Sequence, residues 1–71
     1  MAKKVLINTE YIKLNQFLKW AGLAETGGEA DIMISEGTVQ VNGEAEQRRG
    51  RKLYSGDTVT VYGDEYTCWR D

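Results

Sequence analysis

The chain has 71 residues, with nine Lys and Arg against eleven Asp and Glu and a net charge of −2. A domain of this size buries only about 60% of the surface that its unfolded chain exposes, which leaves little room for a deep catalytic cleft. The sequence has no His and one Cys, so the usual zinc spacings, imidazole acid/base chemistry and an internal disulfide are excluded.

The chain shows no repeat, no low-complexity tract and no Pro, so we expect residues 1–71 to form a single domain. No apolar run approaches the roughly 18 residues of a membrane span. Lys3 and Lys4 lead into only Val5, Leu6 and Ile7, which is too short for the core of a signal peptide. We therefore expect a cytoplasmic protein with no membrane partner.

A first helix is predicted over Leu14–Ala21. Its apolar residues fall at positions i, i+3, i+4 and i+7, the spacing that places them on one helical face. Gly22 follows where helices commonly end in a left-handed residue, and Leu23 can fold back as the accompanying apolar contact.

A second helix is predicted to begin at Thr26. Thr26 and Glu29 have the spacing of a capping box, in which each side chain satisfies a backbone N–H of the first turn. The apolar spacing continues from Ala30 to Gly37, where Gly is the better stop. The two helices would form a hairpin through Leu23–Glu25.

The remaining segments predict strands. Asn42-Gly43 is a strong hairpin-turn signal, and Ser55–Asp57 and Gly63-Asp64 are further turns. The expected strands are Lys4–Ile7 at an edge, Thr38–Val41, the region of Leu53-Tyr54, Thr58–Tyr62 and Glu65–Trp69. The sequence therefore predicts an α+β domain in which a helical hairpin packs on one face of a small, mostly antiparallel sheet.

A basic run is the sharpest local signal in the sequence. It comprises Arg48, Arg49, Arg51 and Lys52 around Gly50. The guanidinium group offers a planar fork of donors that matches phosphate oxygens, and Gly lets a nucleic-acid strand approach closely. The alternative is a solvated loop, or one that pairs with Glu44 and Glu46 just upstream. The run alone does not decide between them.

Several short patterns occur in a characteristic order. They are Lys13-Leu14-Asn15-Gln16-Phe17-Leu18, Gly22-Leu23, Thr26-Gly27-Gly28-Glu29-Ala30, Gly37-Thr38-Val39-Gln40-Val41-Asn42-Gly43 and Gly56-Asp57. In this order the chain resembles the S4 RNA-binding domain from Lys13 to Val61. The segment Glu46–Leu53 resembles the basic segment of the short stand-alone bacterial S4-like proteins.

The resemblance implies an S4-like fold and non-catalytic binding of structured RNA, with ribosomal RNA or a ribosome-assembly particle as the target. S4 domains commonly contact RNA through an Arg before Leu and an Arg after Ser, and these positions are Lys13 and Gly27 here. Asp31 and Glu36 add negative charge to the second helix, which weakens phosphate contact there. We therefore expect the basic run to carry the main contact, with Lys13 supporting it from the first helix.

Three further features have competing interpretations. Lys19 is either a helix-borne RNA contact or an ordinary solubilising residue. The N–H groups of Gly27 and Gly28 suit a phosphate, but the capping box explains this turn without a ligand. Most aromatic side chains are expected in or near the core. Those that could stack on bases are Trp20, Tyr54, Tyr62 and Trp69, and Tyr54 beside the basic run is the strongest candidate.

Two functions of different classes fit the sequence. The first is an RNA-binding protein that is monomeric and needs no cofactor or metal. The second is a protein-interaction adaptor whose basic loop docks on an acidic partner, which the net charge of −2 favours slightly. No spacing among the eleven carboxylates selects an acid/base pair, so we do not expect an enzyme.

Overall fold

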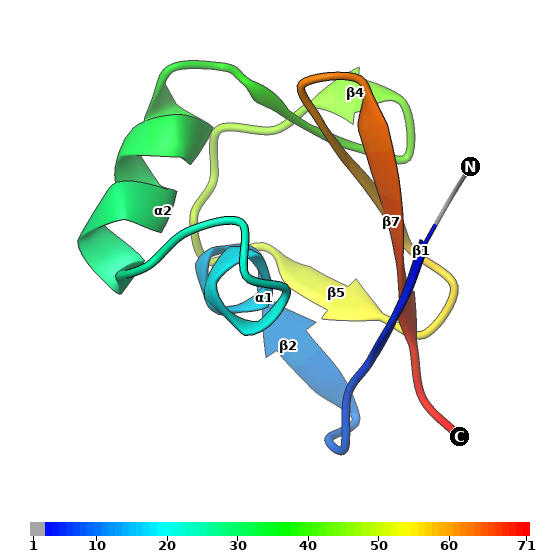
Figure 1. Cartoon of the computed structure of the whole chain (residues 1–71). Helices are drawn as coiled ribbons and strands as arrows, with labels where there is room; N and C mark the ends of the chain where they lie inside the picture. The colour runs from blue at the N-terminus through cyan, green and yellow to red at the C-terminus, as the bar shows by residue number, and fades with distance from the viewer. Residues whose placement is uncertain (1–2) are drawn as a thin grey trace.

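The structure is a computed structural model that describes residues 3–71. Within these residues two helices and seven strands follow one another along the chain (Figure 1). They are β1 (Lys3–Leu6), β2 (Tyr11–Lys13), α1 (Leu14–Trp20), α2 (Gly27–Ser35), β3 (Val39–Val41), β4 (Glu44–Ala45), β5 (Lys52–Tyr54), β6 (Thr58–Val61) and β7 (Asp64–Trp69).

The strands form a five-stranded sheet in the order β1-β7-β6-β3-β4 and a separate two-stranded sheet, β2-β5. Every pairing is antiparallel except that of β1 with β7, so the predicted edge strand is confirmed and runs parallel to its neighbour. Figure 1 shows the two helices on one side of the molecule, with the larger sheet opposite and the two-stranded sheet beneath α1. The predicted α+β architecture is therefore confirmed.

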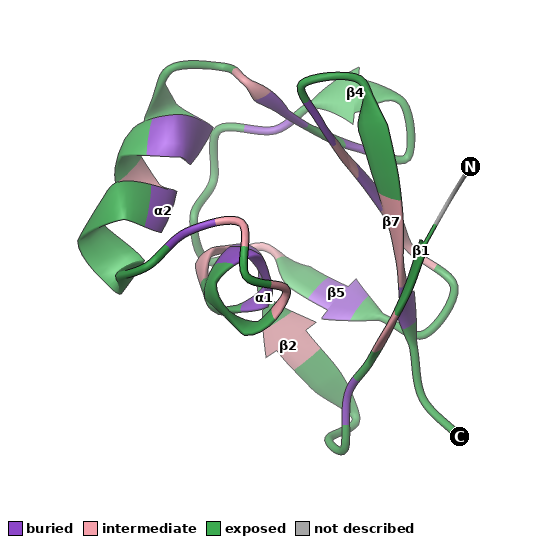
Figure 2. Ribbon diagram, viewed as in Figure 1, coloured by how far each residue is buried: buried purple, intermediate pink, exposed green. Residues whose placement is uncertain are grey.

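The core lies between the helices and the two sheets (Figure 2). Both helices and four of the strands contribute buried residues to it, and Phe17 and Leu18 are completely buried. Burying such side chains stabilises the fold by about 1.5 to 3 kcal/mol each. Leu53 of β5 is also completely buried, and Ile12 of β2 packs against the core, which attaches the two-stranded sheet to the rest of the domain.

The helix ends follow the predicted signals. Gly22 adopts φ +79° after α1, and the N–H of Leu23 donates to the carbonyl of Leu18. At the start of α2 the Thr26 hydroxyl accepts from the N–H of Glu29 at 3.1 Å. The Glu29 carboxylate accepts from the N–H of Glu25 at 3.3 Å, one residue before the donor that a standard capping box uses.

Two hairpins have the same two-residue turn with both residues left-handed. Asn42 and Gly43 have φ values of +52° and +86°, and Tyr62 and Gly63 have +51° and +83°. The first turn is the predicted one. The second turn was predicted one residue too late, at Gly63-Asp64. The strand ends at Val61, and Tyr62 takes a left-handed conformation that Tyr seldom adopts.

The sequence did not predict β2 or β4 as strands. Each is very short, and β2 leads directly into α1. Its pairing with β5 is a contact between residues about forty positions apart, with Ile12 opposite Leu53. Such a pairing has no local signal beyond a brief alternation.

Replacing Tyr62 tests the strain in the second hairpin. Tyr62 is 75% exposed, so little packing is lost in Tyr62→Asn, and Asn adopts the left-handed region more readily than Tyr. We expect the free energy of unfolding, measured with urea, to rise by about 0.5 kcal/mol. Gly63→Ala, at φ +83°, should instead lower it by about 1 kcal/mol. Equal effects of the two substitutions would contradict the assigned turn.

Candidate nucleic-acid interface

The two-stranded sheet has one inward and one outward face. The register places Ile12 opposite Leu53 toward the core. It also places two pairs of exposed side chains on the other face, which we call the ribbon face. They are Tyr11 opposite Tyr54 and Lys13 opposite Lys52. Side chains that are directly opposite in an antiparallel pair lie on the same face and contact each other.

The ribbon face combines aromatic rings with positive charge. The ring centroids of Tyr11 and Tyr54 are 5.9 Å apart, and Nζ of Lys52 lies 4.7 Å from the centre of the Tyr11 ring. Among residues 3–71, no carboxylate forms an ion pair with Lys13 or Lys52. Like charges directly across a strand pair repel each other, so an anion between them would be stabilising.

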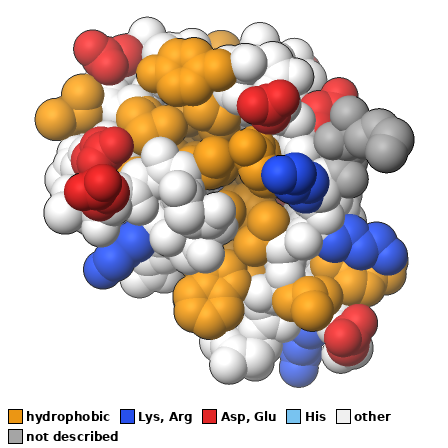
Figure 3. Space-filling model, viewed as in Figure 1, with side chains coloured by type: hydrophobic (Ala, Val, Ile, Leu, Met, Phe, Trp, Pro, Cys, Tyr) orange, Lys and Arg blue, Asp and Glu red, His pale blue; other side chains and the backbone are white. Residues whose placement is uncertain are grey.

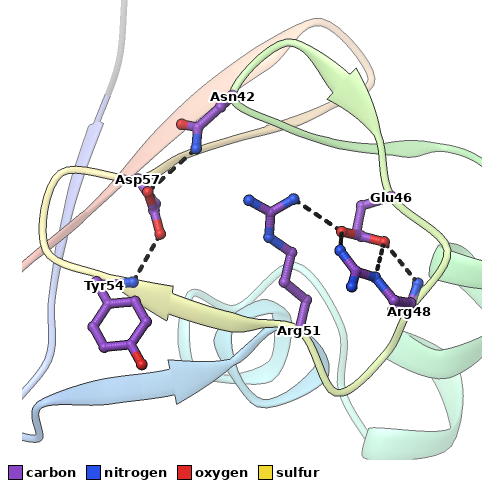
Figure 4. A network of polar contacts seen from close by, with 6 residues as sticks. All are labelled: Asn42, Glu46, Arg48, Arg51, Tyr54 and Asp57. Atoms are coloured by element: carbon purple, nitrogen blue, oxygen red, sulfur yellow. Dashed lines mark hydrogen bonds and ion pairs between the residues drawn. The ribbon is translucent and has the colours of Figure 1, made fainter.

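The loop before β5 is organised around a buried carboxylate. Glu46 is only 7% exposed and accepts hydrogen bonds from Arg48 and Arg51 (Figure 4). Its partners are the Arg48 N–H at 3.1 Å, Nε of Arg48 at 3.1 Å, and Nη2 of Arg48 and Nη1 of Arg51 at 2.9 Å each. We call residues 46–51 the Glu46 loop.

The same contacts shift the acidity of Glu46. The side chain of Arg48 makes the largest contribution and holds the pKa of the carboxyl at about 2, against an ordinary value of 4.5. The backbone N–H of Arg48 and the side chain of Arg51 act in the same direction, while burial opposes them. Glu46 in turn raises the pKa of the Arg48 guanidinium. The loop therefore keeps its ion pairs throughout the neutral range.

The arginines of the basic run differ in how much of each side chain is exposed to solvent. The side chains of Arg48 and Arg49 are 76% and 72% exposed, whereas that of Arg51 is 30% exposed and turned toward Glu46 (Figure 4). Pairing with an upstream carboxylate, the alternative given for this run, is thus correct for Glu46. Arg48 and Arg49 still present most of their guanidinium surface to solvent.

The Glu46 loop also closes the first turn of α1. The N–H groups of Leu14 and Asn15 donate to the carbonyls of Arg51 and Arg49 at 2.8 and 3.0 Å. Lys13, at the N-cap, provides no side-chain hydrogen bond. The loop carbonyls therefore satisfy donors that a helix start otherwise leaves unpaired, and these donors are not available to a phosphate.

Asp31 of α2 connects the helical hairpin to this loop. Its Oδ2 pairs with Nη1 of Arg49 at 3.2 Å, and its Oδ1 accepts from Nδ2 of Asn15 at 3.1 Å. The negative charge that the sequence placed on the second helix is thus partly balanced by Arg49. The pair is largely exposed, so it orients Arg49 more than it stabilises the fold.

A second carboxylate fixes the other end of β5. Asp57 accepts from the N–H of Tyr54 at 2.8 Å and from Nδ2 of Asn42 at 3.2 Å (Figure 4). The Asn42-Gly43 and Gly56-Asp57 patterns are therefore joined by a direct contact. Glu46 and Asp57 together hold β5 at its entry and its exit.

The structure brings together most of the residues predicted for binding. Lys13, Lys52 and Tyr54 lie on the ribbon face, and the three Arg residues lie in the adjacent loop. Lys13 ends β2 and occupies the N-cap position immediately before α1, so the description of it as helix-borne is wrong. Lys19 lies in the last turn of α1, at the opposite end of that helix.

One residue of the ribbon face was missed in the sequence. Tyr11 stands opposite Tyr54, and the alternation Tyr-Ile-Lys in β2 matches Lys-Leu-Tyr in β5. This matching alternation was the sequence signal from which the place of Tyr11 on the ribbon face could have been predicted.

The expectation that most aromatic side chains lie in or near the core is wrong. Phe17 is completely buried, but five others are exposed: Tyr11, Trp20, Tyr54, Tyr62 and Trp69. Figure 3 shows one face of the molecule, where charges of both signs are scattered around a hydrophobic strip without a continuous basic patch.

Two other chemical features are limited by the structure. Cys68 is fully buried, and burial raises the pKa of its thiol, with the charge of Asp57 adding to the effect. A protonated, inaccessible thiol is a poor nucleophile. In the part of the chain from residue 3 onward, no helix is long and apolar enough to cross a membrane.

A family model described as S4 domain matches residues 5–68. The chain belongs to the S4 domain family. The match covers both helices and extends from β1 into β7, so the resemblance seen in the sequence is confirmed.

Curated relatives of this S4 domain protein are bacterial and of similar length. The chain is 51% identical over 63 residues to the probable ribosome maturation protein RlbA of Bacillus subtilis (strain 168). The matched region covers 89% of this chain and 89% of RlbA. It is 40% identical over 53 residues to the putative RNA-binding protein YbcJ of Escherichia coli (strain K12), covering 75% of this chain and 76% of YbcJ.

Solved structures agree with this assignment. The solution structure of YbcJ from E. coli, described as containing a motif involved in RNA binding, matches with a TM-score of 0.72 at 30% identity over 97% of this chain and 89% of that one. The 30S ribosomal protein S4e from Thermoplasma acidophilum matches with a TM-score of 0.64 at 19% identity, over 84% of this chain and 32% of that one. The second likeness concerns the fold alone.

The low pKa of Glu46 predicts a pH-dependent stability. Because the folded-state pKa is about 2 and the ordinary value is 4.5, the contribution is complete above pH 4.5 and is lost as the pH falls toward 2. We expect Glu46→Gln to lower the free energy of urea unfolding by about 1 kcal/mol at pH 7. The difference between the two proteins should shrink between pH 4.5 and 2. A constant difference over that range would contradict the role given to the Glu46 charge.

Proposed function

We propose that this S4 domain protein binds structured RNA without catalysing a reaction, through the ribbon face and the exposed arginines of the Glu46 loop. The main support is the pair Lys13 and Lys52, which face each other across two strands next to the exposed pair Tyr11 and Tyr54. Two adjacent ammonium groups bind phosphate oxygens, while aromatic rings stack on unpaired bases.

The local charge supports this proposal despite the net charge of −2. The ribbon face and the Glu46 loop contain five cations, namely Lys13, Arg48, Arg49, Arg51 and Lys52. Glu46 and Asp31 pair with three of them, which leaves a local excess of three positive charges. Phosphate affinity follows this local field rather than the charge of the whole protein.

The target we propose is ribosomal RNA or a ribosome-assembly particle. RlbA is named a probable ribosome maturation protein and YbcJ a putative RNA-binding protein, and both are similar to this chain over most of its length. Contacts to phosphates and shape fix a protein on folded RNA without requiring a particular sequence. Residues 1–71 would act as one cytoplasmic, monomeric domain.

The second helix has a smaller role in this proposal. Gly27 stands where the family commonly has Arg, and Asp31 and Glu36 are acidic. Thr26 and Glu29 already use the side-chain capping contacts at the start of α2. Lys19 would add at most a peripheral contact, because it lies at the far end of α1 from Lys13.

The dependence of binding on salt tests the electrostatic part of the proposal. If about three phosphates are engaged, the logarithm of the association constant should fall with the logarithm of the salt concentration at a slope of roughly −2 to −3. The measurement is a fluorescence-anisotropy titration of a labelled ribosomal RNA fragment at several KCl concentrations. A slope near zero would reject a phosphate-based interface.

A charge-matched pair of variants tests the location of the interface. Lys13→Gln with Lys52→Gln should weaken RNA binding about tenfold or more and make the salt slope shallower by about 1 to 2, since two phosphate contacts are lost. Lys3→Gln with Lys4→Gln removes the same charge from β1 and should change affinity less than threefold. Equal losses in both double variants would show that only the total charge matters.

Nuclease treatment separates RNA binding from the adaptor alternative. Purified under low salt, the protein should carry RNA that is released by nuclease digestion. An acidic protein that stays bound after nuclease treatment would instead support docking of the basic loop on a protein partner.

A further inference from the structure

A cavity of about 420 Å³ lies directly beside the ribbon face. It is formed by the segment that leads from β1 into β2 together with one side of α1. Its lining includes Tyr11 and Lys13 of the ribbon face, Trp20 of α1, and the polar residues Asn8, Glu10 and Gln16. The cavity and the proposed RNA surface therefore share two residues and are continuous.

Trp20 is held in an exposed position at this cavity. Its side chain is 60% exposed, yet Nε1 donates to the carbonyl of Leu6 at 2.7 Å. This hydrogen bond fixes the ring between the end of β1 and the last turn of α1. An exposed indole with a fixed orientation provides a flat apolar surface at little entropic cost on binding.

The chemistry around the ring fits a nucleotide. An indole face stacks on any base. Asn8, Glu10 and Gln16 provide donors and acceptors for the edges of a base, and Lys13 provides a cation at the border with the ribbon face. A volume of 420 Å³ is within the usual range of small-molecule sites and holds a single base with space for water.

We infer that this cavity takes up one unpaired base of the bound RNA, with the base stacked on Trp20 and its phosphate near Lys13. This inference rests on the proposed function and makes it more specific. The protein would prefer a stem that carries an extruded nucleotide over a fully paired stem. The ribbon face would bind both kinds of stem, and the cavity would account for the higher affinity for the stem with the extruded nucleotide.

Two RNA hairpins that differ by one nucleotide test this inference. One has a continuous twelve-base-pair stem and the other has the same stem with a single bulged adenosine. We expect the wild-type protein to bind the bulged hairpin about 5- to 150-fold more tightly, which is the range for stacking one base. Trp20→Ala should lose this preference and keep its affinity for the continuous stem.

The control variants separate stacking from folding. Trp20→Phe keeps an aromatic ring and should retain part of the preference, while Tyr62→Asn removes an exposed aromatic that does not line this cavity and should retain all of it. A dispersed ¹⁵N–¹H spectrum of each variant shows that it is folded. In wild-type protein, AMP should shift the indole N–H resonance of Trp20 and leave that of Trp69 in place.

The outcomes distinguish the inference from the proposed function. Equal affinity for the two hairpins, or a preference that survives Trp20→Ala, would overturn the base-binding cavity while salt-dependent binding of the continuous stem leaves the RNA interface standing. If neither hairpin binds, both are overturned. A hexaglutamate peptide that shifts the cavity resonances where AMP does not would assign the cavity to an acidic protein partner and overturn the inference.

Discussion

The carboxylate of Glu46 is the interaction on which the arrangement of the proposed interface depends. It is nearly buried, and it accepts hydrogen bonds from both the backbone and the side chain of Arg48 and from the side chain of Arg51. These bonds turn Arg51 inward and leave Arg48 exposed. The loop carbonyls can then cap α1, so the helix, the loop and β5 are positioned by one set of contacts. As a consequence, the charges of Arg48 and Arg51 are already partly neutralised in the free protein.

The ribbon face shows how an acidic protein can present a small positively charged surface. Cross-strand pairing places Lys13 beside Lys52 and Tyr11 beside Tyr54, although the members of each pair are about forty residues apart in the chain. Asp57 holds the exit of β5 through the N–H of Tyr54, as Glu46 holds its entry. Negative charge is thus used where it orders the backbone, and uncompensated positive charge remains on one small face. The distribution of charge over the surface, rather than the net charge, decides which ligands such a domain attracts.

The sequence predicted the features that have a local cause. The two helices follow from apolar spacing, from the Thr26 cap and from Gly22, and the first hairpin follows from Asn42-Gly43. It did not predict β2, because three residues next to a helix carry almost no strand signal in the sequence. Their strand conformation depends on pairing with the distant β5. The turn at Tyr62 was displaced because the β6–β7 hairpin closes at the pair Val61 and Asp64, which places Tyr62 in the left-handed region that Tyr seldom adopts. Among the candidate site residues, Lys13, Lys52 and Tyr54 converge, whereas Arg51 is mostly engaged by Glu46 and Tyr11 became evident only from the register.

Photo-crosslinking is the decisive test of the ribbon face as the RNA interface, because it reports which residues touch RNA. Ribosomal RNA that contains 4-thiouridine would be irradiated in complex with the protein, digested with nuclease and protease, and analysed by mass spectrometry. We expect crosslinks in the peptides that contain Tyr11 and Tyr54, on the two strands of the ribbon face. Crosslinks confined to α2, with none on β2 or β5, would contradict it.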